Sequence, residues 1–262
     1  MYRPLKRALF RSVPEAAWWP LQRATRFRHA PLDAAPLARI ASEPLDHLSD
    51  PDYLTHELLP GMGLSTWSAL EPVFPRHLRS KVGRGVQAIQ FPIQFGPYLA
   101  AMTQAGITSY LELGVDGGGA FAITVEVLRR FGLRRAVAVD LYVPPILEQW
   151  RRPEVEFVQM DSHSPAFVDL LRDRAPIDLA FIDGDHLEEG VRRDFDALRP
   201  HARMLAFHDI VQEYGWPGVG RVWSSIREEY PDEYGFREFV AHYPEVPHAR
   251  MGIGLAVRRD DS

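Results

Sequence analysis

The sequence contains no cysteine among its 262 residues. This excludes a disulfide framework, a thiolate metal site and a cysteine nucleophile. No run of about 18 apolar residues is present, so we expect no segment to span a membrane. Lysine is also scarce: only Lys6 and Lys81 accompany the arginines, which leaves few candidates for Schiff-base chemistry. The net charge of −5 argues against a nucleic-acid-coating protein, and we expect a cytoplasmic protein without a nucleic-acid partner.

Basic residues are concentrated at the start of the chain. Residues 1–31 carry seven arginine and lysine side chains against a single acid, Glu15, and include Trp18 and Trp19. A basic arm that packs on the domain or on a second subunit is the favoured interpretation. Contact with an anionic membrane surface and an organelle-targeting segment are the alternatives. We therefore expect a homo-oligomer.

The chain divides into two regions of different texture. Residues 1–85 contain many prolines and lack a strand period, with short helices expected near 36–40 and 52–59. We interpret 1–85 as a mostly helical, loop-rich N-terminal extension. Residues 86–262 form the second region, and they carry all the motifs described below.

Strand-like and helix-like segments alternate through the second region. Strands are expected at 108–113, 135–139, 155–160, 177–182, 203–207, 236–241 and 252–257, and helices at 96–104, 120–131, 165–174, 187–198 and 219–230. This alternation predicts an α/β domain with a doubly wound, mostly parallel seven-stranded sheet. Ligands bind such sheets at the carboxyl ends of the strands, so the residues that follow each strand matter most.

A glycine-rich turn follows the first strand, and an acid follows each of the next two. Glu112, Gly114 and Gly118 frame the turn, where glycines allow close approach of a ligand to the backbone. Asp140 follows the second strand and could accept both hydroxyl protons of a ribose. Asp161 follows the third strand, where it could accept an adenine amino proton or cap the next helix.

Acids and histidines follow the fourth and fifth strands. Asp183 and His186 come after the fourth strand, and His208 and Asp209 come after the fifth. Neighbouring strands of a parallel sheet would bring Asp183, His208 and Asp209 together, a donor set suited to magnesium or manganese. His186, at the mouth of the same cleft, could remove a hydroxyl proton. The alternative is that all four are helix caps and ordinary loop residues.

These motifs together resemble the class I S-adenosylmethionine-dependent methyltransferases. The segment LELGVDGGGAF resembles their E-x-G-x-x-x-G motif, and AVAVDLY resembles their acidic second motif. The segments DLAFIDGDHLEEGVRRDFDAL and MLAFHDI resemble a branch of small-molecule O-methyltransferases that includes macrolide-sugar methyltransferases and cephalosporin-hydroxylase-like proteins. The resemblance covers about residues 85–258 and implies a Rossmann-like methyltransferase fold.

The resemblance implies a role for each matching residue. Glu112, Gly114 and Gly118 would line the amino-acid part of S-adenosylmethionine, Asp140 would hold its ribose, and Asp161 would lie by its adenine. In the metal-dependent members, the positions of Asp183, His208 and Asp209 hold magnesium. The position of His186 carries the general base, and that of Asp183 takes part in catalysis as well.

The expected activity is methyl transfer to a hydroxyl of a small molecule such as a sugar or a natural product, assisted by a divalent metal. A methyltransferase that works without metal is the nearest alternative. A nicotinamide-dependent oxidoreductase would share the glycine turn and Asp140, and a non-catalytic protein could retain the cofactor pocket. The loop at 211–220, with Tyr214 and Trp216, is a candidate wall of the acceptor pocket.

Overall fold

The computed structural model describes residues 30–65, 74–211, 217–246 and 249–259. The basic side chains of the N-terminal arm, Trp18 and Trp19, and Tyr214 and Trp216 of the expected acceptor loop lie outside these residues. In the described part of the chain, no helix is long and apolar enough to cross a membrane.

Seven strands form one sheet in the order β3-β2-β1-β4-β5-β7-β6. The strands are β1 (Ser109–Leu113), β2 (Arg135–Asp140), β3 (Val155–Gln159), β4 (Ile177–Ile182), β5 (Ala202–His208), β6 (Tyr234–Phe239) and β7 (Ile253–Arg258). Strands β1 to β5 pair in parallel, and β7 runs antiparallel to both β5 and β6. The predicted seven-stranded, mostly parallel sheet is confirmed. The order reverses between β1 and β4, so their carboxyl ends open onto a ligand crevice.

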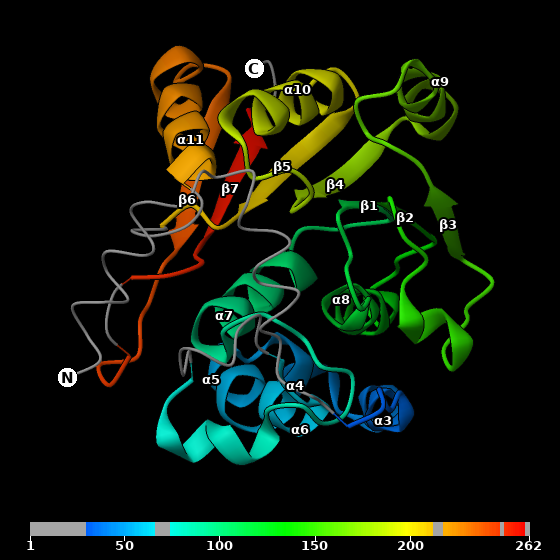
Figure 1. Cartoon of the computed structure of the whole chain (residues 1–262), viewed down its shortest axis with the longest axis vertical. Coiled ribbons are helices and arrows are strands. Elements are labelled where there is room, and N and C mark those ends of the chain that lie inside the picture. Colours follow the sequence, from blue (N-terminus) through cyan, green and yellow to red (C-terminus); the bar gives the residue numbers. More distant parts are fainter. Residues whose placement is uncertain (1–29, 66–73, 212–216, 247–248, 260–262) are drawn as a thin grey trace.

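Helices cover both faces of the sheet (Figure 1). On one face lie α9 (Pro165–Arg174), α10 (Glu188–Leu198) and α11 (Pro217–Glu229). On the other face lie α7 (Pro92–Thr103) and α8 (Gly119–Arg129), with the N-terminal helices beyond them. The side-chain alternation of β1 explains the two cores. Leu111 packs in the core beneath α9–α11, whereas Tyr110 packs in the core beneath α7 and α8.

The described part of the N-terminal extension is helical, as predicted. Its elements are η2 (Ala35–Leu37), α3 (Ala38–Ser42), α4 (Leu45–Ser49), α5 (Pro51–Tyr53), η3 (Leu54–Leu58), α6 (Leu59–Met62) and η4 (Arg76–Lys81), and one further short helix, η5 (Pro145–Glu148), lies after β2. The sequence analysis did not predict α4 or η4. Ile40, Leu54 and Leu58 share a core with Phe95 and Tyr98 of α7, so these helices pack on their own chain. A boundary between residues 85 and 86 stays a prediction.

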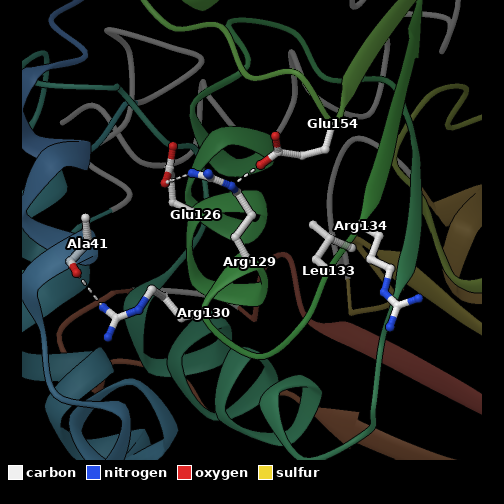
Figure 2. Close-up of a pocket in the computed structure, with 7 residues that line it drawn as sticks. All are labelled: Ala41, Glu126, Arg129, Arg130, Leu133, Arg134 and Glu154. Carbon is white, nitrogen blue, oxygen red and sulfur yellow. Dashed lines mark hydrogen bonds and ion pairs between the residues drawn. The ribbon is translucent and has the colours of Figure 1, made fainter.

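A surface pocket marks the edge of the sheet opposite the strand ends discussed above. Figure 2 shows it at the end of α8, where Arg129 pairs with Glu126 and Glu154. Its volume is about 470 Å³. Arg130 donates hydrogen bonds of 2.7 and 2.8 Å to the carbonyl oxygens of Ile40 and Ala41 at the end of α3. This guanidinium therefore fastens the N-terminal helices to α8.

We expect Arg130→Ala to destabilise the protein by about 1–3 kcal/mol, because two carbonyls lose a charged donor. Urea unfolding followed by circular dichroism measures the change. Arg134→Ala is the matched control, since Arg134 lines the same pocket but makes no side-chain hydrogen bond or ion pair within the described residues. Equal unfolding midpoints for the two variants would show that Arg130 does not fasten the extension.

Candidate active site

The glycine loop after β1 lies directly against the loop after β4. Gly114 has a φ of +77°, and a Cβ there would lie 2.3 Å from the Asp183 carbonyl oxygen. Only glycine fits both the left-handed backbone and the close approach. The turn therefore brings the predicted cofactor loop and the predicted metal ligand Asp183 to adjacent positions.

The other end of this loop begins helix α8. Gly118, with a φ of +83°, is its N-cap, and no side chain caps the helix. A Cβ on the preceding Gly117 would meet nothing within 4 Å, so open space lies beside the loop. Uncapped backbone N–H groups at a helix N-terminus attract an anionic group such as a carboxylate. The loop and the helix start thus form a cradle that suits the amino-acid end of the expected cofactor.

Asp140, at the end of β2, holds the glycine loop from the other side. Its Oδ2 accepts hydrogen bonds from the backbone N–H groups of Val115 and Asp116, at 2.8 and 3.0 Å. Its Oδ1 accepts one from the Tyr142 N–H at 2.9 Å. The carboxylate therefore fixes the shape of the loop, a role that the sequence analysis did not assign to it.

Glu112 is a buried acid on the face of β1 that meets α7 and α8. It is 3% exposed, and its carboxyl group accepts a hydrogen bond from the Tyr110 hydroxyl. Burial raises the pKa of Glu112 to about 8; the Tyr110 hydrogen bond opposes this shift and the charge of Asp183 adds to it. Glu112 is therefore mostly neutral at pH 7. The alternating pattern of β1 could have identified Tyr110 as its neighbour on the same face.

Asp183, His208 and Asp209 converge at the ends of β4 and β5, as the sequence predicts. One donor atom from each lies within 4.8 Å of the others. The Nδ1 of His208 is 3.0 Å from the Asp183 Oδ1 and 3.6 Å from the Asp209 Oδ1. The register of the two strands pairs Ile182 with Phe207, which places the following residues side by side.

The backbone at Asp209 is in the left-handed region, with a φ of +63°. Few residues other than glycine adopt this conformation, although aspartate and asparagine do so more readily than most. The Asp209 side chain is nevertheless only 8% exposed, and its Oδ2 lies 3.0 Å from the His186 Nε2. Such strain is retained when the surrounding structure fixes it, and it is concentrated at functional sites.

His186 lies between the two acids rather than at the mouth of the cleft, where we expected it. The residue is 5% exposed. Its Nε2 is 3.0 Å from the Asp209 Oδ2 and 3.4 Å from the Asp183 Oδ1. The contacts of its Nε2 with the two carboxylates hold the ring inside the cluster rather than at its mouth.

The carboxylates of Asp183 and Asp209 raise the pKa of both imidazoles, His186 and His208. Burial alone would lower the pKa of His186, but hydrogen bonds to Asp183 and Asp209 outweigh it and raise the pKa to about 10. Burial alone would also lower the pKa of His208. The charges of Asp183 and Asp209 outweigh it and raise the pKa of His208 to about 9. Both rings are therefore cationic at pH 7 when nothing else neutralises the carboxylates.

Asp161 does not join this cluster. Its side chain is exposed, and its Oδ1 accepts a hydrogen bond from the His163 backbone N–H at 2.9 Å. The residue thus closes an Asx turn before α9, while its proximity to an adenine stays a prediction.

A second buried acid, Asp194 of α10, was missed by the sequence analysis. It is 0% exposed, and its Oδ1 lies 3.4 Å from the Nε2 of His163. The helical spacing contained a signal for it. Val191, Asp194, Phe195 and Leu198 recur at the interval of the buried stripe, so an acid occupies a core position.

Comparison with known proteins gives a family match over the segment that carries the strand-end motifs. Residues 111–210 match the family model described as a methyltransferase domain. No curated protein matches the chain significantly.

Several solved structures are similar to this chain at low sequence identity. The MycE methyltransferase of the mycinamycin biosynthetic pathway, in complex with Mg, SAH and mycinamycin VI, is 21% identical with a TM-score of 0.46; the match covers 64% of this chain and 50% of that one. An O-methyltransferase from Bacillus cereus in complex with SAH is 16% identical with a TM-score of 0.46, covering 60% and 77%. TomG, the O-methyltransferase from Streptomyces achromogenes involved in tomaymycin synthesis, is 17% identical with a TM-score of 0.47, covering 65% and 81%.

The match thus spans about half the length of the MycE chain. Residues 111–210, which run from β1 through β5, thus match a methyltransferase domain and lie within the seven-stranded sheet described above.

Proposed function

We propose that this chain transfers the methyl group of S-adenosylmethionine to a hydroxyl oxygen of a small molecule, a sugar or a natural product, with the help of a divalent cation. The observation that carries the proposal is the convergence of Asp183, His186, His208 and Asp209 beside the glycine loop. A methyl donor in that loop and a hydroxyl group near the cluster would be neighbours. Magnesium in the MycE complexes and the natural-product pathways of MycE and TomG are consistent with it.

The residues of the cofactor side fit the methyl donor. Gly114, Gly118 and Glu112 would line its amino-acid part, Asp140 its ribose and Asp161 its adenine. The support is the open space beside Gly117 and the uncapped start of α8. These roles are proposals for the individual residues.

The residues of the acceptor side fit a divalent cation. Asp183 and Asp209 supply carboxylate oxygens and His208 an imidazole nitrogen, a set that suits magnesium or manganese. When bound, such an ion lowers the pKa of a hydroxyl group and fixes its position.

The chain's own part in the reaction is proton transfer and alignment. His186 takes the hydroxyl proton on its imidazole ring while the oxygen attacks the methyl carbon; the carbon–sulfur bond breaks, and its electron pair stays on sulfur. Asp183 and Asp209 hold the His186 ring in place and stabilise the imidazolium that forms. The glycine loop keeps the donor in line with the acceptor, which supplies much of the rate.

A methyltransferase that needs no cation is the second candidate. The 3.0 Å contact between the His186 Nε2 and Asp209 favours it, because a histidine oriented by a carboxylate is itself a base. In that case Asp183 and Asp209 would serve His186 alone.

Methyl transfer from labelled S-adenosylmethionine to a panel of sugars and catechols tests the proposal. Turnover should stop with a chelator and return with added magnesium or manganese. Chelator-resistant turnover would favour the second candidate. The absence of both S-adenosylhomocysteine binding and turnover would contradict a methyltransferase function altogether.

We expect Asp140→Ala to weaken S-adenosylhomocysteine binding by about 1–3 kcal/mol, because ribose acceptors are lost and the Val115 and Asp116 N–H groups lose theirs. Calorimetric titration of the folded variant measures this. Asp173→Ala removes an exposed acid of α9 and serves as the control. Equal affinities for the two variants would contradict the ribose assignment.

A homo-oligomer also stays a prediction. Sedimentation velocity on the whole chain tests it, and a monomer at all concentrations would contradict it.

A further inference from the structure

The pocket of Figure 2 lies where the N-terminal extension meets the α/β domain. Its volume of about 470 Å³ is within the range of about 300–1,000 Å³ that is usual for small-molecule pockets. The extension contributes Ala41 of α3, and the rest of the lining comes from α8, the turn that follows it and the residue before β3. None of the functions proposed above uses this pocket.

The two acids of the pocket already have partners. Glu126 is 3% exposed; its Oε1 accepts a hydrogen bond from the Trp150 Nε1 at 2.6 Å, and its Oε2 accepts one from the Arg129 Nη1 at 3.0 Å. The Nε of Arg129 pairs with Glu154, and the Nε of Arg152 lies 2.6 Å from the Glu126 Oε1. Two arginines thus balance the two carboxylates, and neither acid is left to neutralise a further guanidinium group.

Arg130 presents an unused edge of its guanidinium group. Its Nη1 donates to the carbonyl oxygens of Ile40 and Ala41, at 2.7 and 2.8 Å, and these bonds fix the orientation of the group. Within the described residues, neither its Nε nor its Nη2 has a hydrogen-bond partner, and no carboxylate pairs with it. The parallel N–H groups along this edge match the two oxygens of a carboxylate or a phosphate.

Arg134 adds a second positive charge to the pocket. Its side chain is exposed and has no carboxylate partner in the described part of the chain. In Figure 2 its guanidinium group points away from that of Arg130, and Leu133 lies between the two in this view. Two cations without counter-ions therefore flank an apolar side chain in one pocket.

We propose that this pocket binds a small organic anion. Its carboxylate or phosphate group would lie on the Nε–Nη2 edge of Arg130, with Arg134 as the second cation and the organic part against Leu133 and Ala41. Because Ala41 belongs to the extension and Leu133 and Arg134 to the α/β domain, the bound ligand would join the two. The inference does not depend on the proposed methyl transfer.

Calorimetric titration of the whole chain with phenyl phosphate, benzoate and inorganic phosphate, at equal ionic strength, tests the inference. We expect an aromatic anion to bind more tightly than inorganic phosphate, because its ring leaves water against Leu133. The comparison of phenyl phosphate with benzoate shows which oxyanion the site prefers. The urea midpoint should rise with the concentration of the tighter ligand, since that ligand stabilises the folded chain. If none of the three anions binds at millimolar concentration, the inference is overturned.

Three variants test whether the anion lies in this pocket. Arg134→Ala should weaken the tighter ligand at least about tenfold, because a charge-assisted contact is lost. Arg130→Lys keeps the charge and a donor for the carbonyls but loses the two-pronged edge, so it should also weaken binding at least about tenfold. Arg151→Ala is the matched control, since it removes the same charge from an exposed arginine outside the pocket and should keep the affinity.

Unchanged affinity in Arg134→Ala or in a folded Arg130→Lys would place the anion elsewhere, for example at the uncapped start of α8, and would overturn the inference. An equal loss in Arg151→Ala would assign the binding to net charge and overturn it as well. Circular dichroism shows whether each variant folds. Arg134→Ala decides alone if Arg130→Lys does not, because the exposed Arg134 side chain makes no contact that the fold needs.

Discussion

Asp183→Asn and Asp209→Asn should each abolish divalent-cation binding while leaving the affinity for S-adenosylhomocysteine nearly unchanged. Replacing a residue that only orients a metal ligand costs about 10–100-fold in metal affinity, so loss of a ligand itself should cost at least about 100-fold. Cofactor binding should persist because the residues proposed to hold the cofactor, Gly114 and Asp140, lie at other strand ends. Turnover should fall with the loss of the cation.

Manganese titration followed by electron paramagnetic resonance measures cation binding directly, and calorimetry measures the cofactor. Asp185→Asn is the matched control, because Asp185 lies between Asp183 and His186 in sequence but directs its Oδ1 to the Leu187 N–H instead. The proposed cation site is contradicted if Asp183→Asn binds manganese as tightly as Asp185→Asn does. Circular dichroism shows whether each variant folds.

His186→Ala should lower the rate by about 10²–10⁴-fold, the usual contribution of a general base, while both ligands still bind. His208→Ala is the informative partner variant. Its ring faces the same carboxylates, yet we expect it to weaken cation binding, whereas His186→Ala should not. Comparing the two variants therefore distinguishes a general base, His186, from a cation ligand, His208.

The pH dependence follows from the charge on His186. Only a neutral imidazole accepts a proton, and the pKa of His186 is raised to about 10 when Asp183 and Asp209 are not neutralised. The rate should therefore rise with pH, and if the reaction needs no cation it should still be rising at pH 9. Neutralisation of the two carboxylates removes the cause of the shift, so added magnesium should move the rise to lower pH. A rate that is independent of pH would exclude His186 as the base.

If a chelator has no effect while His186→Ala is inactive, the second candidate, a reaction without metal, is correct. If neither treatment changes turnover, the chemistry lies outside the cluster of Asp183, His186, His208 and Asp209. Purified protein, one acceptor and the five single variants named above are enough to distinguish these outcomes.

Most of the sheet could be predicted because its signals are local. Segments such as 177–182 are apolar strands with turn residues on both sides, and the structure has β4 at the same bounds. The short helix α4 was missed because five residues between prolines carry too little periodicity. The convergence of Asp183 with His208 was also predictable, since it requires only that the strands before them be parallel neighbours.

The sequence by itself therefore determined the α/β fold, the strand ends that carry the candidate site and the residue types available there. The tertiary structure decided how those residues meet. It turned His186 inward between two acids, tied Asp140 to the Val115 and Asp116 N–H groups, and brought Asp194 of α10 to His163. These contacts join segments that are distant in sequence or depend on rotamers. Helix packing and burial select them, and neither leaves a local pattern in the chain.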